Sequence, residues 1–489
     1  MKLRTVATTA TAVIALMFTA PVWAGPVDDA QRSQILADVD RQNAELSRTA
    51  LAIWDYAEVG FQEERSSALL QARLRAAGFT IEAGVAGMPT AFVARYRRGE
   101  GGPVIGIMAE FDALPGLSQQ AQPAQAVEPD GHAGHGCGHN LFGAASVTAA
   151  IATRNWMQAN NVSGEIRLFG APAEEGGSGK VFMVRAGLTA DVSAMLHWHP
   201  DDQNSAAQNT ALANVSGKFR FVGVSAHAAG APERGRSALD GVEALNYMVN
   251  MMREHVPQDA RIHYVITEGG NAPNVVPASA EVYYYVRHPN QRVVVDIMER
   301  VQAAARGAAM GTGTTMSFAQ VGGTFDLLPN DTLGRMVDAN LRRVGPPVWG
   351  ETERRFIDQI TPTFGAGATI PTTDIQPYSS GAINYGSTDV GDVSYTTPTA
   401  GFGVATWAPG TAAHSWQAVA ASGSTIGVIG ANVAAKVLAL TAADLFQSPE
   451  AVAEARAELE RRRGADFVYR SLLGDNPPSL NYRRNPGAR

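Results

Sequence analysis

The sequence has 489 residues, which is too long for one compact core and indicates about two domains. Hydrophobic residues make up 45% of the chain and charged residues 17%, as in an ordinary soluble globular protein. The net charge of −7 disfavours a general binder of nucleic acids or of anionic membranes.

Residues 1–24 have the pattern of a secretory signal peptide. Lys2 and Arg4 form a basic start, Thr11–Ala20 is largely apolar, and Val22-Trp23-Ala24 places small residues where a signal peptidase cuts. We therefore expect export to the periplasm or the medium. A membrane anchor is the alternative, but the apolar run is short for a span and no other segment looks transmembrane.

Residues 25–213 alternate between helical and strand-like hydrophobic periodicity. Helices are predicted at Ala30–Tyr56, Glu63–Ala77, Leu141–Ala159 and Val181–Ala186, and strands at Thr90–Tyr96, Val104–Ala109, Glu165–Phe169 and Val192–Leu196. Such alternation predicts an α/β fold with a mainly parallel, helix-covered sheet. In such sheets, binding sites lie at the carboxyl ends of the strands.

Residues 214–328 have a different texture. Strands are predicted at Lys218–Val224, Arg261–Thr267, Ala280–Arg287 and Thr314–Gln320, and helices at Asp240–His255 and Val293–Ala309. The order β-α-β-β-α-β is that of a ferredoxin-like α+β domain. We interpret this segment as an insertion into the first domain.

Residues 329–447 return to the first domain, and residues 448–489 form a C-terminal tail. The predicted elements are helices at Asp331–Val344, Thr425–Leu445 and Glu450–Arg463 and a strand at Gly401–Thr406. Pro362–Thr397 lacks periodicity and is expected to be a functional or covering loop. The tail suggests no role.

Residues that commonly bind metals occur at four separate places, each at the end of a predicted strand or in an adjoining loop. They are Cys137 with His139, Glu174 with Glu175, His197 with His199, and His414. Thiolate, imidazole and carboxylate are ligands for zinc-like ions. Any one of them could be an ordinary polar residue, but four at one sheet edge indicate a metal centre.

Cys137 is the only cysteine and cannot form an intrachain disulfide. A lone thiol in an exported protein is exposed to oxidation unless it is buried or bound to a metal. The glutamate pair could divide the labour, with one residue as a ligand and the other as a general base, or could simply face a helix dipole. Gly176–Lys180 is not a phosphate loop, because the upstream glycine is missing and Val181 replaces Ser or Thr.

Seven segments carry a family resemblance, in order, over about residues 35–445. They are Gly136–Asn140, Ala171–Gly177, Trp198–Pro200, Ser225–Ala229, Asn274–Pro277, Gly386–Ser394 and His414–Gln417. The chain resembles the dinuclear metallo-aminoacylase and carboxypeptidase superfamily, in its amidohydrolase branch, and is most similar to the p-aminobenzoyl-glutamate hydrolase type. Asn140 matches that type. The resemblance implies a zinc-peptidase-like catalytic domain with an inserted lid or dimerisation domain.

The resemblance implies two divalent metal ions (Zn, Mn or Co) held by Cys137, His139, Glu175, His199 and His414, with Glu174 as the general base. His199 is preferred to His197 because it lies 24 positions after Glu175, as in the branch. A thiolate bridge by Cys137 is a hypothesis. Asp112 resembles an aspartate that orients a ligand, whereas Glu110 stands where the wider superfamily has a histidine ligand.

In the inserted domain, His227 resembles a histidine that reaches across a dimer interface to the scissile carbonyl, where it would stabilise an oxyanion. Asn274 and Arg287 resemble residues that face the substrate, and an arginine fork suits a carboxylate. From the residues alone, an N-cap-like or turn residue before Pro232 is the favoured interpretation of His227.

The implied activity is hydrolysis of the amide of an N-acyl or N-aroyl amino acid by a metal-bound hydroxide. The implied partner is a second copy or a similar subunit, joined through the inserted domain. Two alternatives stay open: a metallo-dipeptidase or carboxypeptidase acting on short peptides, and a non-catalytic partner subunit of a two-subunit hydrolase.

Overall fold

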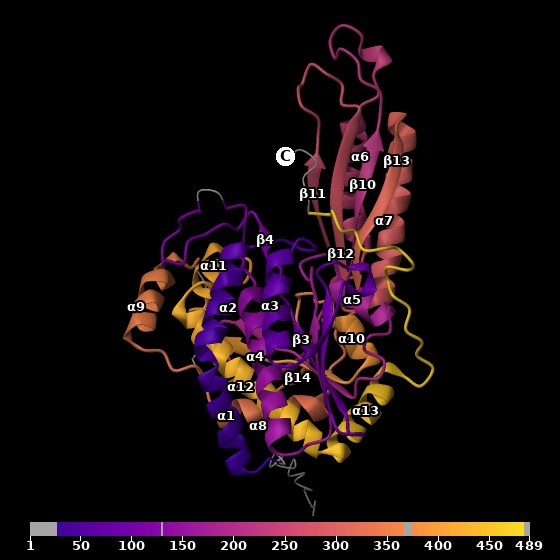
Figure 1. The fold of residues 1–489 in the computed structure, drawn as a ribbon. Helices are drawn as coiled ribbons and strands as arrows, with labels where there is room; N and C mark the ends of the chain where they lie inside the picture. The colour runs from indigo at the N-terminus through magenta and orange to yellow at the C-terminus, as the bar shows by residue number, and fades with distance from the viewer. Residues whose placement is uncertain (1–26, 129–130, 366–373, 484–489) are drawn as a thin grey trace, which may run out of the picture.

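The computed structural model describes residues 27–128, 131–365 and 374–483. The predicted signal peptide lies outside these residues, as does the middle of the predicted loop at Pro362–Thr397. The described chain forms an α/β unit, which we call the main unit, and a narrower lobe that projects from it, which we call the lid (Figure 1).

A six-stranded sheet runs through the main unit. Its strands, in spatial order, are β1 (Thr80–Ala83), β2 (Phe92–Arg98), β6 (Gly164–Gly170), β3 (Val104–Ala109), β7 (Ala194–Leu196) and β15 (Thr399–Ala400). The pairings from β6 to β15 are parallel, and β1 and β2 add an antiparallel edge. Strands β3 and β6 are buried along their whole length, as expected where helices cover both faces. The predicted mainly parallel sheet is confirmed.

Helices lie on both sides of this sheet (Figure 1). They are α1 (Asp29–Arg41), α2 (Asn43–Tyr56), α3 (Glu64–Ala76), α4 (His139–Ala159), α5 (Gly179–Arg185), α8 (Asp331–Val344), α10 (Val390–Thr396), α11 (Trp416–Ser422), α12 (Thr425–Gln447) and α13 (Pro449–Arg463). The prediction of one helix over Ala30–Tyr56 is wrong. The chain kinks at Gln42, and each half then turns its own apolar residues toward the core.

Helix α12 is long and apolar enough to cross a membrane, yet 83% of its most apolar window is buried inside the fold. It packs against α4, α8 and α1. Its apolar composition on all sides is therefore that of a core helix enclosed by other helices.

The lid has a four-stranded antiparallel sheet with two helices. The sheet order is β11 (Arg261–Glu268), β12 (Ser279–His288), β10 (Ala213–Val222) and β13 (Thr315–Thr324), and the helices are α6 (Ala238–Met252) and α7 (Gln291–Thr312). Its core contains Phe219 and Tyr284, whose rings meet edge to face at 5.7 Å. Along the chain the order is β-α-β-β-α-β, so the predicted ferredoxin-like fold is confirmed.

The predicted loop at Pro362–Thr397 is wrong in part, because it contains β14 (Ser380–Ile383) and α10. Strand β14 pairs with β9 (Gln208–Thr210), and α10 carries the fully buried Asp392, whose carboxylate accepts a bond from the Phe325 amide at 2.9 Å. These partners are remote in sequence, so local periodicity does not reveal them. The remaining elements are β4 (Leu114–Pro115), β5 (Ala133–Gly134), β8 (His199–Asp201), β16 (Gly403–Ala405) and α9 (Glu351–Ile360).

Candidate metal centre

The candidate residues gather at the carboxyl edge of the main sheet. Strand β3 leads into Glu110 and Asp112, β6 leads into the turn that carries Glu174 and Glu175, and β7 is followed by His199 in β8. Cys137 and His139 stand at the start of α4, and His414 precedes α11. Parallel strands bring their carboxyl ends to one edge, which explains why residues from remote parts of the chain meet there.

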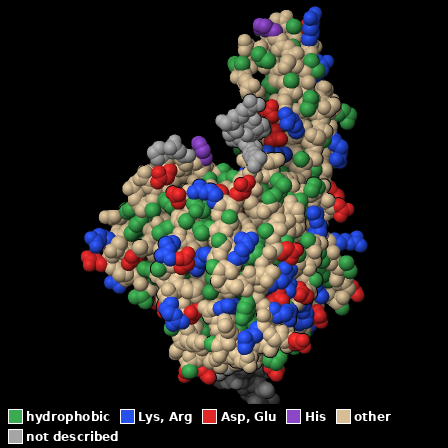
Figure 2. All heavy atoms as spheres, in the orientation of Figure 1, with side chains coloured by type: hydrophobic (Ala, Val, Ile, Leu, Met, Phe, Trp, Pro, Cys, Tyr) green, Lys and Arg blue, Asp and Glu red, His purple; other side chains and the backbone are tan. Residues whose placement is uncertain are grey.

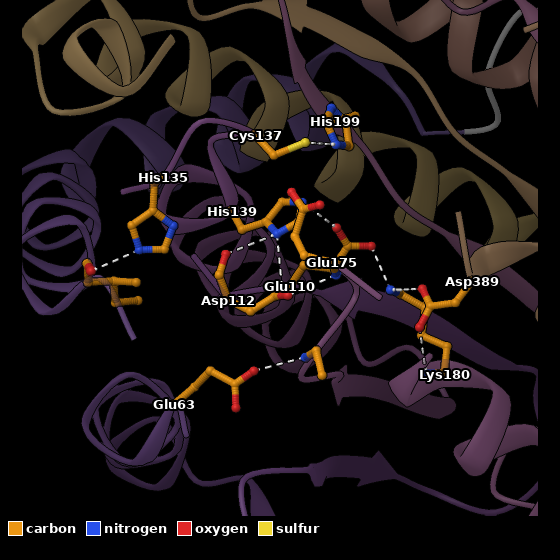
Figure 3. Close-up of polar contacts among 12 residues, drawn as sticks. Glu63, Glu110, Asp112, His135, Cys137, His139, Glu175, Lys180, His199 and Asp389 are labelled. Atoms are coloured by element: carbon orange, nitrogen blue, oxygen red, sulfur yellow. Dashed lines mark hydrogen bonds and ion pairs between the residues drawn. The ribbon is translucent and has the colours of Figure 1, made fainter. Parts of the chain in front are cut away.

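Two groups of potential ligands share one thiol. Cys137, His139 and His199 form the first group, and Cys137, Glu175 and His414 form the second; within each group the ligand atoms lie within 4.8 Å of one another. The Cys137 Sγ atom is 3.5 Å from His199 Nε2 (Figure 3). The structure therefore brings all five predicted ligands together. That they bind metal stays a prediction, and the shared thiol suits two ions.

Two of the histidines are oriented by neighbouring oxygen atoms. His139 Nδ1 lies 2.9 Å from Asp112 Oδ1, and His199 Nδ1 lies 2.6 Å from the Pro200 carbonyl oxygen. In its neutral form with the proton on Nδ1, each ring would present an unprotonated Nε2 to the shared space, which is the form of histidine that binds metals. A carboxylate or carbonyl behind a histidine is the usual support of a metal ligand.

Several buried polar atoms in this space contact one another directly. His139 Nε2 lies 3.1 Å from Glu110 Oε2, and Glu175 Oε1 lies 3.4 Å from His414 Nε2. If His139 is neutral with its proton on Nδ1, its Nε2 and the Glu110 oxygen are two facing acceptors, an arrangement that a bound divalent cation would stabilise. This donor set fits borderline divalent ions such as zinc, manganese or cobalt.

A buried lysine stands behind the cluster. Lys180 Nζ lies 2.7 Å from Glu110 Oε1 and 2.5 Å from Asp389 Oδ1, and all three side chains are buried (Figure 3). Burial alone would raise the pKa of Glu110, but Lys180 and His139 hold it below its ordinary value. Sequence reasoning missed this ion pair. The available signals were a lysine in a glycine-rich turn and a glutamate in the place of a histidine.

The thiol of Cys137 favours its ionised form. Burial and Glu175 act to raise the pKa of Cys137, but His199 and His139 bring it down to about 6. A thiolate is the form of cysteine that binds metals. The protein thus prepares Cys137 as a ligand at neutral pH.

The turn at Ala173–Gly177 carries both glutamates and is held by buried acids. The Ala173 amide, on a residue with φ of 57°, donates to Glu63 Oε1 at 2.8 Å, and the Glu175 amide donates to Asp112 Oδ2 at 2.9 Å. Glu63 had no sequence signal beyond starting a helix. It is buried and far from the turn in sequence, so only the fold reveals its contact.

Glu174 lies with Glu110 and His139 in a third close group. Burial raises the pKa of Glu174 well above its ordinary value, and the nearby carboxylates of Glu110 and Glu175 raise it further. A raised pKa makes this carboxylate a stronger base toward a nearby proton, which suits a proton shuttle.

Other residues of the sequence motifs lie outside these groups. Burial lowers the pKa of His197 to about 4, and its ring packs against Gly401. His135 Nε2 is 3.0 Å from the Ile53 carbonyl oxygen, so its ring supports the loop. Asn140 donates to the carbonyl groups of Ala50 and Ser422 at 3.1 and 3.0 Å and ties α4 to its neighbours.

The three predicted lid residues lie in the projecting lobe. His227 is exposed, and its Nδ1 accepts bonds from the amides of Ala229 and Gly230, which leaves Nε2 to donate outward. Asn274 is exposed in the segment beside it, where its carbonyl accepts from the Ala228 amide at 3.0 Å.

Arg287 lies on β12, with its guanidinium 5.5 Å from the centre of the Tyr285 ring and its Nε buried without a partner. The Tyr285 hydroxyl comes close to Gly176, since a Cβ placed on that glycine would collide with it. Arg287 thus contacts the ring of Tyr285, whose hydroxyl reaches the glutamate turn. In the single chain, the contacts of His227 are with its own loop and with Val275.

Comparisons with known proteins agree with this architecture. Residues 213–312 match the model of the peptidase dimerisation domain. The chain is 39% identical over 450 residues to a subunit of the p-aminobenzoyl-glutamate hydrolase of Escherichia coli, covering 86% of this chain and 92% of that protein. It is 27% identical to the Xaa-Arg dipeptidase of Mus musculus, covering 86% and 90%.

Among solved structures, the fold matches a dinuclear metal binding peptidase of the M20 family from Bacillus subtilis. The TM-score is 0.55 at 18% identity, over 83% of this chain and 99% of that one. The likeness in sequence to the hydrolase subunit, the dimerisation domain and the common fold have one explanation: the chain belongs to the M20 peptidase family.

Proposed function

We propose that the protein is a metal-dependent amidohydrolase that cleaves the amide of N-aroyl or N-acyl amino acids such as p-aminobenzoyl-glutamate. The observation that carries this proposal is the pair of ligand groups joined through Cys137, with Glu174 beside them. The 39% identity to the p-aminobenzoyl-glutamate hydrolase subunit of Escherichia coli supports the substrate class.

The residues divide the work as follows. Cys137, His139, Glu175, His199 and His414 would hold two divalent ions. Such ions, when bound, activate water and polarise a carbonyl group. Glu174, whose pKa is raised by burial and by neighbouring carboxylates, takes a proton from the attacking water and delivers it to the leaving amine.

The lid supplies the other substrate contacts in this proposal. His227, with its Nε2 free to donate, would reach the scissile carbonyl oxygen of a partner chain's substrate. Arg287, with its unsatisfied Nε beside Tyr285, would bind a substrate carboxylate. Asn274 lies in the segment beside His227 and would face the same substrate.

A second candidate is a dipeptidase acting on short peptides, because the chain is also 27% identical to an Xaa-Arg dipeptidase over most of its length. The two candidates share the metal centre and differ in the acyl side of the substrate. Assay of the purified chain on aroyl-amino acids and dipeptides separates them, and inactivity on both would favour a non-catalytic partner subunit.

Dimer formation through the lid is supported by exposed apolar side chains. Tyr264, Val265 and Ile266 are exposed on β11, which is an edge strand, and Tyr247 and Met251 are exposed on α6. Figure 2 shows apolar side chains along the projecting lobe. An edge strand with apolar residues is suited to pairing with a second copy or with a similar subunit.

Replacing Glu174 with Gln should leave the fold and the bound metal intact and lower kcat by about 10²–10⁴-fold, since the proton shuttle is lost. Hydrolysis of p-aminobenzoyl-glutamate measures the effect, and Glu299→Gln on the exposed side of α7 is the matched control. Activity of Glu174→Gln near that of the control would refute the role of Glu174.

Treatment with a chelator should abolish hydrolysis, and Mn²⁺, Zn²⁺ or Co²⁺ should restore it. Cys137→Ser should lower metal affinity by about 10-fold or more, because loss of even an outer support of a metal ligand costs about 10–100-fold. In the loaded wild type, the single thiol should resist thiol reagents. Full activity after chelation, with elemental analysis showing no metal, would refute the proposed centre.

The purified chain should be a dimer by light scattering, and Val265→Lys should make it monomeric, because a buried charge would be placed in the interface. Met310→Lys, an exposed substitution at the end of α7, should leave the dimer intact. If the wild type is monomeric alone and dimerises only with a similar second subunit, the assembly is a heterodimer and not a homodimer.

We also propose that the protein is exported, on the basis of the basic start, the apolar run and the small residues up to Ala24. Expression with fractionation should place the protein in the periplasm, and mass spectrometry should find a mature chain beginning at Gly25. An intact Met1 on protein from the cytoplasmic fraction would contradict export.

A further inference from the structure

The segment after α13, residues 464–483, crosses from the main unit to the lid and back; we call it the C-terminal strap. In Figure 1 it is the yellow segment that leaves α13 and rises beside the lid. Its first part packs where the chain leaves the lid. The ring of Tyr469 lies 5.5 Å from that of Phe325, directly after β13, and its hydroxyl donates to Asp392 Oδ1 at 2.6 Å.

The middle of the strap contacts both units at once. The Leu472 side chain packs on the lid core, and the Leu472 carbonyl accepts a bond from Gln320 of β13 at 2.9 Å. The next residue, Leu473, is 2% exposed and belongs to the core of the main unit. Arg185 of α5 then donates to the Gly474 carbonyl at 2.7 Å.

The strap ends against the glutamate turn. The Tyr482 hydroxyl donates to the Glu175 carbonyl at 3.2 Å, and Arg483 donates to the same oxygen. The ring of Tyr482 meets that of Phe61 edge to face at 5.8 Å. The Leu480 carbonyl accepts from Gln62 at 2.8 Å, so this end is anchored on the loop before α3.

The Tyr482 and Arg483 side chains pack against the main unit and against each other. A Cβ added at Gly60 would collide with the Tyr482 hydroxyl, so that hydroxyl occupies the space above Gly60. The Arg483 guanidinium lies 5.0 Å from the centre of the Tyr482 ring, so the two donor side chains contact each other. Together they place a neutral donor and a charged donor on one backbone oxygen.

We propose that Tyr482 and Arg483 are positioning residues that fix the Glu174-Glu175 turn through the Glu175 carbonyl. Glu63 and Asp112 of the main unit accept hydrogen bonds from backbone amides of the turn. The strap instead donates hydrogen bonds to a backbone carbonyl of the turn. Since the strap also contacts the lid, it ties the lid to the turn. The proposal rests on the proposed function, which gives Glu174 and Glu175 their roles.

The test uses the full chain with Tyr482→Phe, Arg483→Met and the double substitution. Tyr482→Phe keeps the ring against Phe61 and removes only the hydroxyl, so the fold should survive. The exposed strap residue Arg470 supplies the control Arg470→Met. Metal-depleted proteins are titrated with Zn²⁺ or Mn²⁺ alone by calorimetry, and kcat, KM and Tm are measured on the loaded enzymes.

Each hydrogen bond is worth up to about tenfold in an equilibrium or a rate, so the double variant should lose about 10- to 100-fold in metal affinity or kcat. The KM of the double variant should change by less than about twofold, and so should the metal affinity and kcat of the control. Arg483→Lys should recover part of the loss in Arg483→Met because a charged donor is kept. A double variant with wild-type metal affinity and kcat overturns the proposal. So does a lowered Tm with both quantities unchanged, because that would show a purely structural strap.

Glu175→Gln separates the two levels of inference. Loss of metal affinity in Glu175→Gln without loss in the double variant overturns the strap proposal alone. Unchanged metal affinity in both Glu175→Gln and the double variant overturns the proposed metal centre and, with it, the strap proposal. Loss in both supports both.

Discussion

The ion pair that Lys180 forms with Glu110 and Asp389 lies beneath an unusual concentration of buried acids. Asp112, Glu174, Glu175 and Cys137 lie in the same region, and their burial would be unfavourable without nearby positive charge. Lys180 is a permanent cation there, and the histidines contribute further positive charge. The two groups of clustered ligand atoms that share Cys137 suit divalent ions, which would supply further positive charge.

The backbone around these acids is held by several hydrogen bonds. The glutamate turn has a residue with positive φ, Ala173, and such a conformation persists only when its surroundings hold it. Glu63, Asp112, Tyr482 and Arg483 hold it, and they come from three separated parts of the chain. A metal or catalytic site tolerates only small displacements of its side chains. Such supporting contacts position these side chains more accurately than the ligands alone would.

The lid follows a different principle. It has its own core around Phe219 and Tyr284, separate from the core of the main unit. Its edge strand β11 and the loop of His227 remain exposed in the single chain. A residue that acts on a partner's site has to stay exposed until the partner binds, which agrees with the exposed position of His227. The strap contacts both the lid and the turn, and thus connects the two.

Much of the fold followed from the sequence, because long apolar periodic segments such as those of α4, α8 and α12 carry a strong local signal. The ligands were identifiable because cysteine, histidine and paired glutamates are distinctive at strand ends, and Cys137, His139, Glu175, His199 and His414 do meet in space. The kink at Gln42 and helix α10 were missed, since remote contacts rather than local pattern decide them.

The sequence by itself determined the element order, the α/β character of the main unit, the ferredoxin-like insertion and the residue types available for a metal centre. Only the tertiary structure decided that Lys180 neutralises Glu110, that Glu63 supports the glutamate turn and that Tyr482 and Arg483 reach it. The physical reason is that these are individual buried or part-buried contacts between residues 70 to more than 300 positions apart. Such contacts leave no periodic trace in the chain and arise only when the sheet, the turn and the tail are packed together.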